Sequence, residues 1–150
     1  VLMSRRAAYN PDAPAVGGVA VSGLQFCFEF PLPPDELRVN RRMGQHWGNQ
    51  HRAKKDYQED CGIEALAHEK AIAWRSAWML ERCHLVAVAY LGARQRCDPS
   101  DLGSWCKVPL DVLVAQGILA SDSAACVRSF TAIVERDARN PRLEITLKGE

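Results

Sequence analysis

The sequence predicts a single α+β domain, a small mixed β-sheet with helices packed mainly on one face. Strand-like and helix-like segments alternate in the order strand, helix, strand, helix, strand, strand. The 150 residues are enough to bury a core, and 47% hydrophobic with 25% charged residues is an ordinary globular balance. The sequence contains no internal repeat and no glycine-rich nucleotide-binding motif. We therefore expect one domain over residues 23–150, preceded by a flexible segment, 1–22, that is rich in Ala, Gly, Pro and Ser.

The first strand is predicted over residues 24–30, where apolar residues, mostly aromatic, alternate with others and prolines follow. Residues 50–77 have the composition of a helix, rich in Ala, Glu, Lys and Gln. Its apolar face is predicted from residues at helical spacing. We expect this face to hold Ile63, Leu66, Ala67 and Lys70, continued by Trp74 and Trp78 as core residues.

The second half of the chain gives one more helix and three more strands. A strand over 85–90 leads into a polar segment, 94–101. A helix over 102–116 follows, with Asp101 as its N-cap, Pro109 as a bend and Gly117 as its stop. Two further strands are expected, joined by a turn at Arg139-Asn140-Pro141. They cover residues 127–135 and 143–147.

Composition also limits the class of protein. The six cysteines form no Cys-x-x-Cys pair, which favours buried thiols in a reducing cytoplasm over a zinc cluster or a disulfide framework. No apolar run reaches the roughly 18 residues that a membrane helix needs. No apolar export segment follows Arg5 and Arg6. We therefore expect a cytoplasmic protein with no membrane partner.

Positive charge is concentrated in one segment, although the formal net charge of the chain is only +1. Residues 36–55 contain six basic residues against the single acidic Glu36. Such a stripe can bind DNA phosphates, and the alternative is a solvated loop and helix start. Trp47 could stack on an opened base, but we favour the alternative, in which it anchors the loop on the core. The histidines of this segment, His46 and His51, fit a phosphate contact better than a general base.

Candidate chemistry lies between Asp98 and Asp122. Asp98 and Asp101 follow a predicted strand, and Asp122 lies beyond the Gly117 stop, where the chain can return towards the start of the helix. Carboxylates from two loops suit Mg²⁺, which takes one or two carboxylates and keeps several waters. Asp101 as a helix cap and Asp122 as a turn residue are the alternatives. Lys107 and Asp111 stand four apart, and their spacing alone favours a surface ion pair.

The same stretch resembles the signature of RusA-type Holliday-junction resolvases and their phage relatives. That signature runs Arg-x-Asp-Pro-Asp-Asn-Leu, four residues, Lys, three residues, Asp, then Leu-x-x-x-Gly-[Val/Ile]-Leu-x-Asp-Asp. Weaker likeness comes from Pro33-Pro34, Asn40 and the segment 54–57. The likeness covers residues 24–147, and only its centre is specific. The residues that fit the signature without a gap are Arg96, Asp98, Pro99, Leu102, Lys107, Asp111, Leu113, Gly117, Ile118, Leu119 and Asp122.

The resemblance implies a homodimeric, Mg²⁺-dependent endodeoxyribonuclease (with Mn²⁺ as an alternative metal) that resolves four-way DNA junctions by paired symmetric nicks. Two opposed nicks need two sites related by a two-fold axis. By position, Asp98 and Asp122 match the metal-binding carboxylates and Lys107 matches the catalytic lysine. The expected catalytic set is Asp98, Asp101, Lys107 and Asp122, of which the three aspartates hold the metal. The expected DNA contacts are Asn40, Arg41, Arg42, Arg52, Lys54, Lys55 and Arg96.

The sequence departs from the signature at two acidic positions. Ser100 stands where the second Asp belongs, with Asp101 in place of the following Asn, and Ser121 replaces the first of the final Asp pair. Either Asp101 supplies the carboxylate one residue later, which we favour, or the metal lacks a charged ligand. The second case gives the alternative function, a non-catalytic junction-binding protein on the same fold. A third alternative is an unrelated α+β small-molecule protein.

Overall fold

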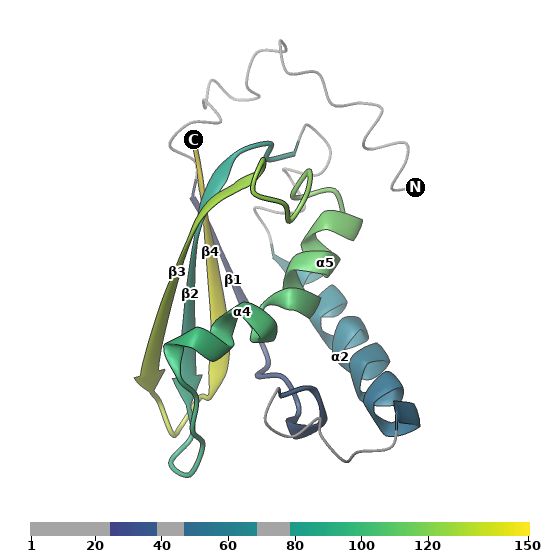
Figure 1. Ribbon diagram of the computed structural model, residues 1–150, viewed down its shortest axis with the longest axis vertical. Coiled ribbons are helices and arrows are strands. Elements are labelled where there is room, and N and C mark those ends of the chain that lie inside the picture. The colour runs from purple at the N-terminus through teal and green to yellow at the C-terminus, as the bar shows by residue number, and fades with distance from the viewer. Residues whose placement is uncertain (1–24, 39–46, 69–78) are drawn as a thin grey trace.

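The computed structural model describes residues 25–38, 47–68 and 79–150 (Figure 1). The predicted segment 1–22, the DNA-contact candidates Asn40, Arg41 and Arg42, and His46 lie outside these residues. The elements, in chain order, are β1 (Gln25–Phe30), the 3-10 helix η2 (Asp35–Leu37), α2 (Trp47–Ala67), β2 (Cys83–Leu91), the 3-10 helix η4 (Pro99–Asp101), α4 (Leu102–Trp105), α5 (Lys107–Ala115), β3 (Val127–Arg136) and β4 (Arg142–Gly149).

The four strands form one mixed sheet in the order β1-β4-β2-β3. β4 is antiparallel to both of its neighbours, whereas β2 and β3 are parallel. The helices α2, α4 and α5 lie together on one face of this sheet (Figure 1). The predicted fold class, a single α+β domain with helices on one face of a mixed sheet, is confirmed. Parallel neighbours cannot be joined by a hairpin, so residues 92–126 cross over and carry η4, α4 and α5.

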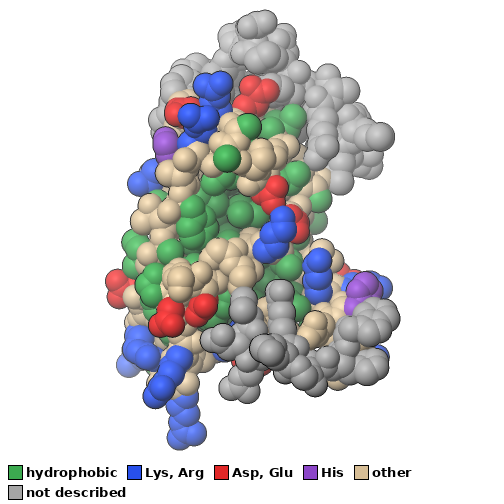
Figure 2. Space-filling model, in the orientation of Figure 1, with side chains coloured by type: hydrophobic (Ala, Val, Ile, Leu, Met, Phe, Trp, Pro, Cys, Tyr) green, Lys and Arg blue, Asp and Glu red, His purple; other side chains and the backbone are tan. Residues whose placement is uncertain are grey.

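Alternation of side chains along the strands builds the core. Every second residue of β1, β2 and β4 is buried towards the helix layer, as the period of two in a strand requires. Ala87 on β2 lies between Ile145 on β4 and Ala132 on β3. At the edge of the sheet, Phe130 on β3 pairs with buried Leu85 but stays 40% exposed. In the view of Figure 2, hydrophobic side chains run down the middle of the molecule, flanked by charged ones.

The predicted apolar face of the long helix is wrong. Ile63 and Leu66 are 63% and 49% exposed. The buried positions are instead Tyr57, Cys61 and Ala65, spaced four apart on one face. Because two of these three side chains are small, the helix backbone can approach its neighbours closely, and Gly62 O accepts a hydrogen bond from Gln116 Nε2 at 3.0 Å. Residues 69–78, with Lys70, Trp74 and Trp78, lie outside the described residues.

The predicted helix 102–116 is divided at Cys106 into α4 and α5. Pro109 has no N–H to donate to the carbonyl of Trp105, and its ring would clash with that carbonyl in a continuous helix. The predicted stop at Gly117 is confirmed by its φ of 78°. Gly117 N–H donates to Val114 O at 3.0 Å and Ile118 N–H to Leu113 O at 2.9 Å. This pair of bonds is a Schellman motif, and it turns the chain sharply after α5.

All six cysteines are free thiols, as the sequence predicts. Cys61, Cys83, Cys106 and Cys126 are buried, while Cys27 is exposed and Cys97 is half-buried. Burial raises the pKa of the thiols of Cys61 and Cys106 to about 12, so both are protonated at neutral pH. They act as small core residues. In the described part of the chain, no helix is both long and apolar enough to cross a membrane.

Two glycine substitutions test the turn after α5. Gly117→Ala forces a side chain into a positive φ, and we expect it to lower the free energy of unfolding by about 1 kcal/mol. Gly103→Ala is the matched control, because this helical glycine has no atom within 4 Å of an added Cβ. It should leave stability unchanged or raise it by up to about 1 kcal/mol. Urea unfolding measures both, and a Gly117→Ala protein as stable as the parent would contradict the motif.

Candidate active site

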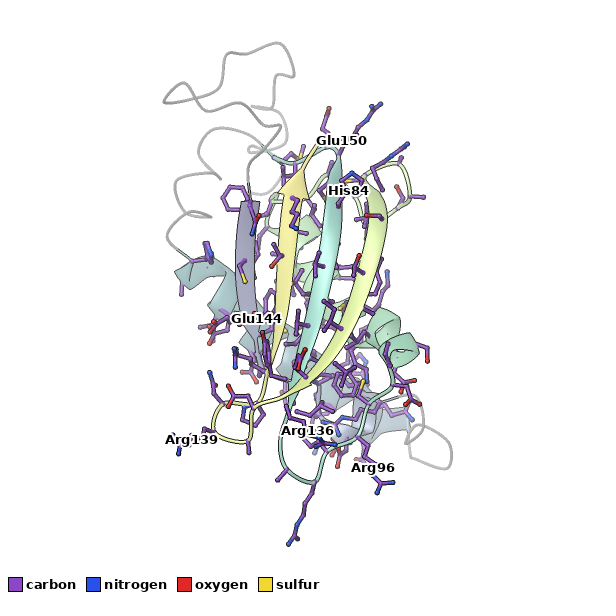
Figure 3. The ribbon with its side chains drawn as sticks, turned by 90° about the vertical axis from the view of Figure 1, so that its left-hand side faces the viewer. His84, Arg96, Arg136, Arg139, Glu144 and Glu150 are labelled. Carbon is purple, nitrogen blue, oxygen red and sulfur yellow. The ribbon has the colours of Figure 1, made fainter. Side chains whose placement is uncertain are left out.

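The exit from β2 is held in place by an arginine of the neighbouring strand. Arg136 Nη1 donates to Gly92 O at 3.0 Å and to Gln95 O at 3.3 Å. Gly92 N–H donates in turn to the side chain of Gln95 at 2.7 Å. Figure 3 shows Arg136 and Arg96 at the same end of the sheet. These bonds fix the segment that leads to Asp98.

Asp98 and Asp101 lie at the two ends of one short turn, because Asp98 is the N-cap of η4 and Asp101 is its last residue. Asp101 N–H donates to Asp98 O at 2.9 Å, and Asp98 N–H donates back to Asp101 Oδ2 at 3.1 Å. Pro99 begins this turn, where its missing N–H costs nothing. Asp98, which is extended, and Asp101 occupy the N-cap and N3 positions of a capping box, and this arrangement brings the two aspartates together at the start of the turn.

The predicted N-cap role of Asp101 needs correction. Asp101 directly precedes α4, but its carboxylate makes no side-chain cap to that helix and binds backwards to Asp98 N–H. The helical conformation already begins one turn earlier, at Pro99, because Asp98 initiates the 3-10 turn. Asp98 and Ser100 are exposed and Asp101 is half-buried.

Lys107, at the start of α5, is held between two carboxylates. Its Nζ lies 2.6 Å from Asp122 Oδ2 and 3.2 Å from Asp111 Oδ1. The hydrogen bond to Asp122, reinforced by the one to Asp111, raises the pKa of Lys107. The hydrogen bond from Lys107 likewise lowers the pKa of Asp122. At neutral pH, Lys107 and Asp122 are therefore charged.

Asp122 reaches Lys107 because the chain after α5 is anchored. Leu80 and Leu119 form a bridge, in which Leu80 N–H donates to Ile118 O and Ala120 N–H donates to Leu80 O, both at 2.9 Å. Ser121 then shapes the following turn, since its Oγ accepts a hydrogen bond from Ser123 N–H at 3.0 Å. The predicted return of the chain towards the helix start is confirmed, and Ser121 has a local structural role in it.

The carboxylates thus form two groups, Asp98 with Asp101, and Asp111 with Asp122 around Lys107. Among the residues that the structure describes, no three His, Cys, Asp or Glu side chains are close enough to hold one metal ion together. The donor type of the first group still suits Mg²⁺, which binds through one or two carboxylates and completes its shell with water. Asp98 and Asp101 are therefore the residues that could hold this ion, with Asp122 engaged by Lys107.

The described DNA-contact candidates lie in two places, on α2 and in the segment after β2. Arg52, Lys54 and Lys55 are exposed near the start of α2. Arg96 is exposed after β2, at the end of the sheet that also carries Arg139 (Figure 3). The structure therefore offers basic side chains on α2 and beside the Asp98 turn.

One contact near the site was predicted from the sequence and one was not. The predicted ion pair between Lys107 and Asp111 is confirmed at 3.2 Å, and Lys107 is shared between Asp111 and Asp122. Arg38 was not predicted to have a structural role, yet its guanidinium lies 4.9 Å from the ring centre of Trp105 and forms a 2.9 Å ion pair with Asp35. The four-residue spacing signals the first contact, whereas no sequence signal brings Arg38 to Trp105.

No protein-family model matches the chain, and no curated protein matches it at a significant level.

The Lys107–Asp122 contact predicts a pH dependence. In Lys107→Met, the pKa of Asp122 should rise towards the ordinary carboxyl value, about 3.9, because its hydrogen-bonded cation is gone. In the parent protein, a lowered pKa means that the pair stabilises the fold above the ordinary carboxyl pKa. This contribution is lost as the pH falls through the folded-state value.

A carboxyl NMR titration measures this shift directly. Lys148→Met, which removes an exposed lysine on β4, is the control and should leave Asp122 unchanged. An identical titration of Asp122 in the parent and Lys107→Met proteins would contradict the contact.

Proposed function

We propose that this protein is a Mg²⁺-dependent endodeoxyribonuclease that cuts four-way DNA junctions. The observation that carries the proposal is the 2.6 Å contact between Lys107 and Asp122, which are 15 residues apart. These are the positions at which the sequence resembles the catalytic lysine and a metal-binding aspartate of RusA-type resolvases. A motif that matched by accident would have no reason to bring these two positions, 15 residues apart, into contact.

The turn at Asp98 and Asp101 supports the metal part of the proposal. Its two carboxylates would hold Mg²⁺, which polarises a phosphoryl oxygen and lowers the pKa of an attacking water. The charged ammonium of Lys107 is suited to stabilise negative charge on the phosphate in the transition state. Asp122 and Asp111 hold this ammonium in one position, so less of its side-chain freedom remains to be lost during the reaction.

The local geometry also bears on Ser100. Asp98 and Asp101 are the two positions of one capping box, whereas Ser100 is not part of it. Within this turn, a carboxylate at position 101 is therefore better placed beside Asp98 than one at position 100. This favours Asp101 as the replacement for the missing acid at position 100.

DNA binding and assembly follow from the same proposal. Arg52, Lys54 and Lys55 on α2, with Arg96 near Asp98, would contact phosphates, together with Asn40, Arg41 and Arg42 from outside the described residues. Paired symmetric nicks on a junction require a homodimer with two-fold symmetry. Such an enzyme would act on DNA in the cytoplasm.

A second candidate function is a junction-binding protein without catalysis. The separation of the carboxylates into two groups favours it, because within the described residues they do not form one three-ligand group. Ser100 and Ser121 point the same way, since each stands where an acid is expected and Ser121 has a role in a turn.

Cleavage of a labelled four-way junction in Mg²⁺ separates the two candidates. The parent protein should make paired, symmetric nicks, and Asp98→Asn, Asp101→Asn and Asp122→Asn should each lower the rate by about 100-fold or more, as loss of one charged catalytic contact does. Asp60→Asn is the matched control, because it removes an exposed aspartate of α2 outside the site.

Binding is measured beside cleavage on the same DNA. Junction binding without nicks in Mg²⁺ or Mn²⁺ would overturn the nuclease and support the binding protein. Equal affinity for the junction and for a linear duplex of the same length would count against both candidates.

A further inference from the structure

A pocket of about 370 Å³ lies between α2, η2 and the α4–α5 junction. Residues far apart in the chain line it, from Pro33 and Leu37 to Val108. Its volume falls within the roughly 300–1,000 Å³ of small-molecule sites. A pocket of this size can take one nucleotide and is too small for a duplex.

The pocket has an apolar floor and a polar rim. Leu37, Trp105 and Val108 form the floor, and all three are buried. The position of Trp105 is fixed by Arg38, whose guanidinium lies over its ring. A nucleobase is bound by apolar contacts together with polar groups at its edge, and the polar side chains of Gln50 and Ser104 also line the pocket.

Two lysines belong to the rim, and they differ in their ion pairs. Lys107 already forms ion pairs with the carboxylates of Asp111 and Asp122. Lys54, exposed on α2, has no carboxylate within ion-pair distance among the described residues. The lysine available to a phosphate group is therefore Lys54, which lines the same pocket as the apolar floor.

A second pocket provides an internal contrast. It has a similar volume, about 400 Å³, but carries Glu29, Asp60 and Glu64 with Arg142 as its one basic residue. Its net negative charge would repel a phosphate. Of these two pockets, the first is therefore the one that combines a lysine rim with an apolar floor.

We propose that the pocket between α2 and the α4–α5 junction binds one nucleotide of an opened DNA strand, with its base on the floor of Leu37, Trp105 and Val108 and its phosphate at Lys54. This deepens the proposed function and rests on it for the source of the nucleotide. The pocket adjoins Lys107, which lines it. A base removed from the stack would therefore be held next to the proposed site of cleavage.

Isothermal titration of the full chain with thymidine 5′-monophosphate, inorganic phosphate and thymidine, without divalent metal, tests the pocket. The nucleotide should bind about tenfold or more tightly than either fragment, because base and phosphate then bind together. Lys54→Gln should weaken nucleotide binding about tenfold, the loss of one charge-assisted hydrogen bond, and leave thymidine unaffected. Lys148→Gln, on β4, is the charge-matched control and should change neither.

Amide NMR shifts give an independent readout, expected at Lys54, Ser104 and Val108. No binding of the nucleotide, equal affinity for nucleotide and phosphate, or an unchanged affinity in Lys54→Gln would overturn the pocket. The titration requires no cleavage, so its outcome is separate from the nuclease test. If the protein binds the nucleotide but cuts no junction, only the proposed nuclease function is overturned. If it cuts junctions but does not bind the nucleotide, only the proposed nucleotide pocket is overturned.

Discussion

The parallel pairing of β2 with β3 is the constraint on which the rest of the structure depends. Two parallel neighbours need a crossover connection, and here residues 92–126 provide it. β2 is nine residues long, about 30 Å, and the crossover must return along that length. All the candidate catalytic residues lie on this one connection. Its helices cover the sheet, so the segment that closes the core also carries the site.

Two devices in the crossover position the site. Pro109 divides the helix and thereby begins α5 at Lys107, and the Schellman motif at Gly117 reverses the chain so that Asp122 returns to this lysine. Lys107 takes part in two features. Its ammonium contacts the carboxylates of Asp111 and Asp122, and the residue also lines the pocket that Lys54 lines. The proposed nuclease would need both, a cation held in position and a place for the DNA strand.

Local patterns predicted the parts of the fold that local forces decide. The alternation in residues 24–30 and the Gly117 stop are set by the pleat and by the backbone, so both appear in the sequence. The buried face of α2 was missed because Cys61 and Ala65 are weak hydrophobic signals, and their burial depends on the neighbours of the helix. The spacing of Lys107 and Asp111 was visible. The pocket was not, because its walls come from segments that only the fold brings together.

The proposed nuclease requires that the Asp98–Asp101 turn, which would hold the metal, and Asp122, which holds Lys107, lie in one site. Paramagnetic broadening of amide NMR signals by Mn²⁺, which replaces Mg²⁺ at oxygen sites, tests it most directly. One site predicts that the signals of residues 98–101 and of Asp122 broaden together at the same Mn²⁺ concentration, and that Asp98→Asn abolishes both effects. Broadening at residues 98–101 with none at Asp122, or at neither, would contradict a shared site.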